Sequence, residues 1–214
     1  MYFNVNLRRV TSEDVETFER CIAVGGVALF PADTVYGLAT EPDSVEGVER
    51  LYALKGRRPD KPAAVMFFAL ELALAALPEL AGRTRDAVER LLPGGLTLLL
   101  PNPARRYPLA CADAPETLGL RVPALEGALT PLAAVSWPVL QSSANLAGAP
   151  EARRLTDVEA TIRDGVDLVL DGGELPGTPS TVVDLTAFEH GDFEILREGA
   201  VPSSRVEAVL RSCR

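Results

Sequence analysis

Apolar residues near the start of the chain recur at helical spacing. Val15, Phe18 and Ile22 lie three or four residues apart, and the preceding Thr11-x-x-Asp14 resembles a capping box. Gly25-Gly26 then breaks the pattern, because glycine disfavours a helical backbone. We therefore predict a first helix that begins after Thr11 and stops at Gly25-Gly26.

The rest of the chain alternates between short apolar runs and amphipathic segments. Further capping-box patterns begin at Asp43-x-x-Glu46, Thr156-x-x-Glu159 and Ser204-x-x-Glu207, and each predicts a helix start. Other helices are expected over residues 71–77, 84–92 and 125–135, and the second of the capped helices over 156–163. Strands are expected over residues 27–31, 64–68, 97–100, 118–122, 139–142, 167–170, 181–185 and 193–197.

The order of these elements predicts an α/β protein. Strands and helices mix without strict alternation, which is typical of a twisted mixed β-sheet flanked by helices. The 214 residues show no internal repeat, low-complexity tract or linker, so we expect one domain over residues 1–214. Aromatic residues make up only 6% of the chain, so the core must consist mainly of Val, Leu, Ile and Ala.

The composition predicts a cytoplasmic protein. The most apolar window, residues 63–80, is broken by Glu71 and Pro78, whereas a membrane span needs about 20 mostly apolar residues. The N-terminus has no signal-peptide pattern, and the three cysteines lie far apart, as expected in a reducing cytosol. We therefore expect no membrane contact.

The charge balance limits the kinds of partner. The formal net charge is -9, whereas a protein that coats nucleic acid without specificity needs a basic surface. Any basic site must therefore be local.

The scarcity of histidine excludes several kinds of catalysis. His190 is the only histidine, and its polar Glu-His-Gly-Asp setting favours a solvated loop residue over a catalytic one. Without a histidine cluster or paired cysteines, the sequence offers no transition-metal site. The P-loop and dinucleotide-binding glycine patterns are also missing, so a nucleotide would have to be held in another way.

One strongly basic segment covers residues 55–62, KGRRPDKP. It carries four cations and two prolines after the end of a predicted helix. The cations could form a solvated loop that complements the helix C-terminus. They could equally form a phosphate clamp, because the prolines stiffen the loop and arginine offers a planar fork for phosphate oxygens.

Three further segments place polar groups next to strands: residues 31–38 (PADTVYGL), 142–148 (SSANLAG) and 177–184 (GTPSTVVD). Each could be an ordinary turn, because Asp, Ser, Asn and Gly favour turns. Each could also bind a ligand, since ligands usually lie at strand ends in open α/β sheets.

Taken in order, the chain contains PADTVYGL, KGRRPDKP, PGGLTLLL, TLGLRVP, SSANLAG, PSTVVDL and ILREGA. This series resembles the YrdC-like threonylcarbamoyl-AMP synthase family, in its single-domain branch, over residues 27–200. Lys55-x-Arg57 combined with Ser143-x-Asn145 is the most diagnostic part. The resemblance implies a twisted mixed sheet with a concave active-site face.

The resemblance also implies roles for individual residues. Lys55 and Arg57 match catalytic positions. The positions that resemble the threonine site are Thr34, Arg121, Ser180 and Thr181. The positions that resemble the ATP site are Lys55, Arg57, Lys61, Thr117, Ser143, Asn145, Arg153 and Arg197.

The reaction implied is the synthesis of L-threonylcarbamoyladenylate and pyrophosphate from L-threonine, bicarbonate and ATP. Such a nucleotidyltransferase would supply a tRNA threonylcarbamoyl transferase complex, with at most a weak tRNA contact of its own. Mg²⁺ is expected to arrive on the ATP phosphates, with no metal site built by the protein alone. Positioning and charge neutralisation would serve this chemistry better than a strong base.

Other interpretations remain open. The same fold could serve as a non-enzymatic RNA-binding or ribosome-maturation module, although the complete Lys55-x-Arg57 and Ser143-x-Asn145 set argues against it. A carbamoyl-transfer enzyme would be expected to carry zinc-finger cysteines, which this sequence lacks. Ala32, Gly95 and Ala147 depart from residues common in the family motifs, and the resemblance to the single-domain branch leads us to expect no C-terminal domain of the kind found in the family's longer branch.

The charge of the site makes a geometric prediction. An anionic substrate requires a local positive field in a chain with a net charge of -9. We therefore expect a set of cations to converge on one concave face, with acidic residues mainly elsewhere. These cations are Lys55, Arg57, Lys61, Arg121, Arg153 and Arg197.

Overall fold

The computed structural model describes residues 10–213, whose nine strands form one mixed sheet in the order β7-β1-β2-β6-β3-β5-β4-β8-β9. The pairs β1–β7, β3–β5 and β4–β8 are parallel, and the other neighbours are antiparallel. The strands are β1 (Ala28–Pro31), β2 (Tyr36–Thr40), β3 (Ala64–Met66), β4 (Leu96–Pro101), β5 (Thr117–Arg121), β6 (Val139–Ser143), β7 (Leu168–Val169), β8 (Thr181–Asp184) and β9 (Glu194–Arg197).

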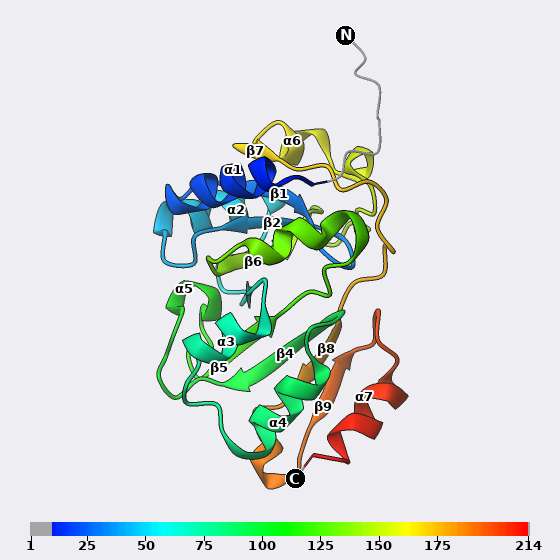
Figure 1. Ribbon diagram of the computed structural model, residues 1–214. Helices are drawn as coiled ribbons and strands as arrows, with labels where there is room; N and C mark the ends of the chain where they lie inside the picture. Colours follow the sequence, from blue (N-terminus) through cyan, green and yellow to red (C-terminus); the bar gives the residue numbers. More distant parts are fainter. Residues whose placement is uncertain (1–9, 214) are drawn as a thin grey trace.

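Helices flank this sheet at both ends (Figure 1). The α-helices are α1 (Ser12–Ala23), α2 (Val45–Lys55), α3 (Leu70–Ala76), α4 (Gly82–Leu91), α5 (Pro108–Cys111), α6 (Ala160–Arg163) and α7 (Ser203–Leu210). The 3₁₀ helices are η1 (Gly127–Ala134), η2 (Leu155–Asp157) and η3 (Phe188–His190). Helix α1 contacts β1 and β2, and α2 contacts β2, whereas α4 contacts β4 and α7 at the other end. The expected α/β fold is therefore confirmed.

None of the helices within residues 10–213 has both the length and the apolar character needed to cross a membrane.

The start of α1 follows its sequence pattern. The Thr11 hydroxyl accepts from the Asp14 amide, and the Asp14 carboxylate accepts from the Thr11 amide, which completes the capping box. The helix buries Val15, Phe18 and Ile22, and the Phe18 ring lies 5.4 Å from that of Phe30 on β1. Burying such an aromatic side chain contributes about 1.5–3 kcal/mol, which fixes the helix on the sheet.

Several of the predicted helix caps and helix boundaries are wrong. Ser44, not Asp43, caps α2, because its hydroxyl accepts from the Gly47 amide. Pro202 precedes α7, which has no side-chain cap. The helix expected over residues 125–135 is the shorter 3₁₀ helix η1, Gly127–Ala134.

The helix expected over residues 156–163 is also interrupted. The Asp157 carboxylate accepts from the Arg153 and Arg154 amides and closes the short η2. Thr156 therefore caps nothing, and α6 begins only after Glu159. The strand β2, Tyr36–Thr40, was not predicted, and it pairs with both β1 and β6.

The two-residue period of the central strands decides which side chains face away from the core. On β4, Leu96, Leu98 and Leu100 are buried in the core, whereas Thr97 and Leu99 face the opposite side of the sheet. On β5, Leu118 and Leu120 likewise pack inward. The alternate positions of these strands, among them Thr97, Leu99, Thr117, Gly119 and Arg121, line the polar cavity described below.

Candidate functional site

A cavity of about 470 Å³ lies over six neighbouring strands of the sheet, which are, in sheet order, β6, β3, β5, β4, β8 and β9. Three arginines from separate stretches of the chain line it: Arg57, Arg121 and Arg197. Two carboxylates, Glu151 and Asp184, line it as well. Hydroxyl and amide groups complete the polar wall, namely Thr97, Thr117, Gln141, Ser142, Ser143 and Ser180.

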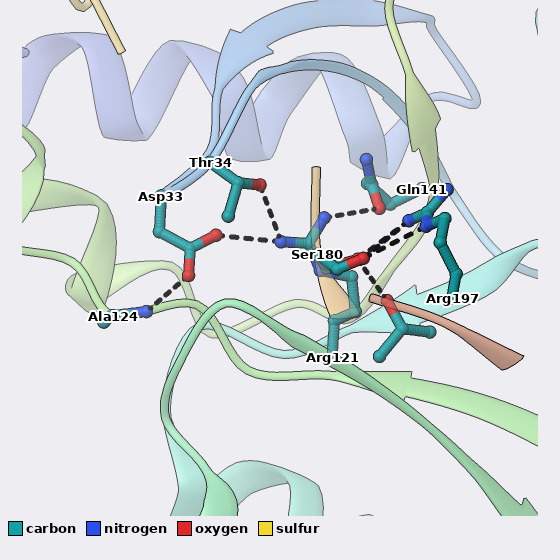
Figure 2. A network of polar contacts seen from close by, with 8 residues as sticks. Asp33, Thr34, Arg121, Ala124, Gln141, Ser180 and Arg197 are labelled. Atoms are coloured by element: carbon teal, nitrogen blue, oxygen red, sulfur yellow. Dashed lines mark hydrogen bonds and ion pairs between the residues drawn. The ribbon is translucent and has the colours of Figure 1, made fainter. Parts of the chain in front are cut away.

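Arg121 is held in place from two sides, as Figure 2 shows. Its Nη2 donates to Asp33 Oδ1 at 2.8 Å and to the Thr34 hydroxyl at 3.2 Å, and its Nη1 donates to Gln141 Oε1 at 3.4 Å. The Asp33 and Arg121 side chains are each only 5% exposed. Burial raises the pKa of Asp33, and the Arg121 charge opposes that rise. The second Asp33 oxygen accepts from the Ala124 amide at 3.1 Å, so both carboxylate oxygens are satisfied.

Arg197 approaches from the edge strand β9. It donates to the Ser180 carbonyl through Nε at 3.2 Å and through Nη2 at 2.8 Å, and Nη2 also lies 3.3 Å from the Ser180 hydroxyl. The Thr97 and Ser180 hydroxyls lie 2.8 Å apart. This chain of contacts places one guanidinium and two hydroxyls at the same wall of the cavity.

Arg57 forms the opposite wall. Its Nη1 donates to the Ser142 hydroxyl at 3.2 Å, its Nη2 donates to the Pro62 carbonyl at 2.5 Å, and its guanidinium lies 5.6 Å from the Tyr52 ring centroid. The Nε atoms of both Arg57 and Arg121 are buried and have no hydrogen-bond partner among residues 10–213. Buried donors of this kind are rarely left unpaired in a native protein, so two of them at one cavity make it suited to an anionic ligand.

Lys55 does not line this cavity. Its ammonium donates to the carbonyls of Ser143 and Asn145, the latter at 2.8 Å, and lies 3.2 Å from Asn145 Oδ1. An ammonium has three protons, so these three acceptors use its donor capacity. Burial lowers the pKa of Lys55 to about 8, and the negative charge of Glu151 opposes this change. The structure therefore places Lys55 behind the Ser143–Asn145 turn.

Asn145 and Arg153 lie beside the cavity rather than in it. Both line a neighbouring cavity of about 360 Å³. The Asn145 amide accepts from the Ser143 hydroxyl at 2.6 Å and donates to the Ala149 carbonyl at 2.6 Å. Arg153 is half-exposed and forms an ion pair with Glu174 at 2.5 Å. Lys61 is exposed and lines neither cavity.

The two predicted threonine-binding hydroxyls of Thr34 and Thr181 are also outside the cavity lining. Thr34 lines an adjoining cavity of about 490 Å³ on the far side of the Asp33–Arg121 pair. Thr181 is fully buried, and its hydroxyl donates to the Val201 carbonyl at 2.6 Å and accepts from the Gly199 amide at 2.9 Å. Thr181 could therefore bind a ligand through its hydroxyl only if that hydroxyl left these partners.

The six predicted cations thus converge only in part. Arg57, Arg121 and Arg197 share the cavity, and Lys55 supports its edge. Arg153 and Lys61 point elsewhere, and two carboxylates stand inside the cavity, where the sequence predicted few.

Two of the three side chains that hold Arg121, Asp33 and Gln141, were not predicted from the sequence. Asp33 belongs to the quoted PADTVYGL segment, and its place before Thr34 was the available signal. Gln141 precedes the quoted SSANLAG segment by one residue and lies on β6 two positions before Ser143, so strand alternation could have found it. Nothing in the local sequence marked Glu151 or Thr97.

Gly95 bears on one departure from the family motifs. A Cβ at this position would lie 2.8 Å from the Ala200 Cβ and 3.2 Å from Thr34 Cγ2. The close approach of the loop around Ala200 therefore requires glycine here, whatever other members carry.

The fold is an open mixed sheet of the α/β class, and its polar cavity with buried arginine donors is suited to a small anionic ligand. The Sua5/YciO/YrdC family model, described as "Telomere recombination", matches residues 20–199, and the chain belongs to this family. The family expected from the motifs is therefore confirmed.

Relatives and solved structures agree with this assignment. The chain is 29% identical over 212 residues to a threonylcarbamoyl-AMP synthase of Pyrococcus abyssi, covering 98% of this chain and 61% of that protein. It is 30% identical over 191 residues to a threonylcarbamoyl-AMP synthase of Bacillus subtilis, covering 86% of this chain and 53% of that protein. The chain thus spans little more than half the length of these two relatives.

The crystal structure of P. abyssi Sua5 complexed with L-threonine superposes with a TM-score of 0.81 at 28% identity. The match covers 97% of this chain and 60% of that one. The whole described fold therefore corresponds to one part of a longer relative.

Proposed function

We propose that this chain forms L-threonylcarbamoyladenylate and pyrophosphate from L-threonine, bicarbonate and ATP. The observation that carries the proposal is the pair of buried, unpartnered Nε groups of Arg57 and Arg121 in one cavity. ATP and the threonine carboxylate are both anions that could satisfy such donors. The names of the two relatives and the threonine complex of P. abyssi Sua5 support the choice of substrates.

The geometry suggests a division of labour among the residues. Arg121, fixed by Asp33 and Gln141, would offer its free Nε to the threonine carboxylate. Arg57 and Arg197 would neutralise the ATP phosphates from opposite walls. Lys55 would keep the Ser143–Asn145 turn in position, which is a supporting role rather than direct contact with phosphate.

The proposed chemistry requires two steps. The threonine amine condenses with bicarbonate to give a carbamate and water. A carbamate oxygen then attacks the α-phosphorus of ATP, the bond from that phosphorus to the bridging oxygen breaks, and pyrophosphate leaves. The cavity would accelerate the reaction by holding the two substrates together and neutralising phosphate charge.

The wider setting follows from the product. Mg²⁺ would enter as part of MgATP, and the product would pass in the cytoplasm to a complex that transfers threonylcarbamoyl groups to tRNA. A non-enzymatic RNA-binding role is less well supported, because the unpaired arginine donors lie buried in a cavity rather than on an open basic surface.

The test is pyrophosphate release from ATP by the purified chain. We expect release only when L-threonine and bicarbonate are both present. Arg57→Ala should reduce the rate by at least about 100-fold, a loss on the scale of removing one oxyanion-stabilising donor. The far-ultraviolet circular dichroism of this variant should be unchanged. Release that does not depend on threonine would contradict the proposal.

A further inference from the structure

Glu151 is an acidic residue in a cavity that otherwise suits an anion. It lines both the main cavity and the neighbouring one that contains Asn145. Its Oε2 atom is buried and has no hydrogen-bond partner among residues 10–213. A buried carboxylate oxygen without a hydrogen-bond partner is energetically costly. This oxygen is therefore suited to contact a ligand that enters the cavity.

In the described part of the chain, none of the cations around Glu151 forms a hydrogen bond to its Oε2 atom. The Lys55 ammonium uses its protons on three oxygens of Ser143 and Asn145. Arg121 directs both Nη atoms to Asp33, Thr34 and Gln141, and Arg153 pairs with Glu174. Glu151 still acts on Lys55 and Arg121 through its charge, so it lies within their electrostatic range.

A bare triphosphate would be repelled by this carboxylate, whereas a divalent cation between them would be attracted by both. Mg²⁺ is commonly bound by one or two carboxylates together with phosphate oxygens and water. Within residues 10–213 no cluster of three or more His, Cys, Asp or Glu side chains could hold a metal ion alone. A single orphaned carboxylate oxygen therefore fits an ion that arrives with the nucleotide.

We propose that Glu151 Oε2 is a direct ligand of the Mg²⁺ carried by ATP, so that the cavity selects MgATP over free ATP. This inference rests on the proposed function, because it requires ATP in the main cavity. It assigns Glu151 a contact with the substrate that the sequence did not indicate.

The experiment is a calorimetric titration of the full chain with ATP, without threonine and bicarbonate, in Mg²⁺ and in EDTA. The unsubstituted chain should bind MgATP more tightly than free ATP. Glu151→Gln should weaken MgATP binding by about tenfold, the scale of one charge-assisted contact. The same substitution should tighten the binding of free ATP, because it removes a repulsive charge. A general loss of structure cannot produce these opposite signs.

Asp184→Asn is the matched control. Asp184 lines the same cavity, but its Oδ1 already accepts from the Thr186 amide at 2.8 Å and its hydroxyl at 2.6 Å. This variant removes the same unit of charge from the cavity without removing the orphaned oxygen. We expect it to leave MgATP binding as tight as before or tighter.

A second readout does not depend on affinity. Mn²⁺ can replace Mg²⁺ in the nucleotide complex, and its electron paramagnetic resonance spectrum should change between the unsubstituted chain and Glu151→Ala. The inference is overturned if Glu151→Gln changes MgATP and free ATP binding in the same direction, or if Asp184→Asn reproduces its effect. If the unsubstituted chain binds neither form, the proposed function fails first and this inference fails with it.

Discussion

Two arginine–carboxylate pairs in this protein have similar lengths and very different surroundings. Arg121 and Asp33 lie 2.8 Å apart with side chains that are each 5% exposed. Arg153 and Glu174 lie 2.5 Å apart with side chains that are 52% and 42% exposed. The shorter distance belongs to the pair that we expect to contribute less to the free energy of unfolding.

The two pairs differ in how well water can solvate the charge that remains when one partner is removed. At the surface, water solvates either charge, and exposed pairs contribute about 0–1 kcal/mol. In the cavity wall, Asp33 is almost wholly shielded from water, and its oxygens accept hydrogen bonds from Arg121 and the Ala124 amide. The comparison therefore teaches that burial, rather than contact distance, decides how strongly an ion pair constrains a site.

The largest effect should follow from breaking the buried pair. Asp33→Ala leaves the Arg121 charge without its counter-ion, so we expect the free energy of unfolding to fall by about 3–5 kcal/mol. Urea unfolding at neutral pH measures this. Replacing both partners by apolar residues should recover much of the loss. A decrease below about 1 kcal/mol for Asp33→Ala would show that the pair behaves like a surface pair.

A second effect tests burial through titration rather than substitution. Because burial lowers the pKa of Lys55 from 10.5 to about 8, the unfolded chain binds a proton that the folded chain has lost between these values. The Lys55 contribution to stability is therefore complete above pH 10.5 and is lost as the pH falls through about 8. It should amount to about 3 kcal/mol over that window.

The measurement is the urea midpoint of the unsubstituted chain and of Lys55→Met at pH 8, 9 and 10. The gain in stability on raising the pH should be smaller in Lys55→Met. Lys61→Met is the control, because Lys61 is exposed and is the other lysine of the chain. Parallel pH profiles for the unsubstituted chain and Lys55→Met would contradict a buried ammonium at this position.

The smallest effect should come from the surface pair. Glu174 accepts from Arg153 at 2.5 Å and from Arg154 at 2.5 Å, and all three side chains are well exposed. We expect Glu174→Gln to lower the free energy of unfolding by less than about 1 kcal/mol, and the difference to shrink in high salt. A loss as large as that of Asp33→Ala, unaffected by salt, would remove the contrast between the two regions.

The sequence identified the elements better than their contacts. Helix α1 and the strands β4 and β5 follow from local periodicity, because each needs one buried face and the spacing of apolar residues records that face. The interrupted segment around Asp157 was not predictable in the same way. The Asp157 carboxylate accepts from the Arg153 and Arg154 amides, and the spacing of apolar residues carries no information about such a contact.

The same distinction applies to the site. Residue types near the cavity were recognisable from motifs, since the basic segment at 55–62 and the hydroxyl-rich segments lie next to strands. The orientation of each side chain was not. Ser180 and Thr181 are neighbours in one motif, yet Ser180 lines the cavity, whereas Thr181 is buried against the loop that contains Val201.

What the sequence by itself determined is the fold class, the family and the segments that surround the cavity. These depend on local patterns and on motifs whose residues are contiguous. Only the tertiary structure decided that Arg121 is fixed by Asp33, that Lys55 faces carbonyl oxygens, and that Glu151 stands unpaired among cations. These facts depend on burial and on contacts between residues that are far apart in the chain. For such buried polar groups, the loss of contact with water determines the free energy.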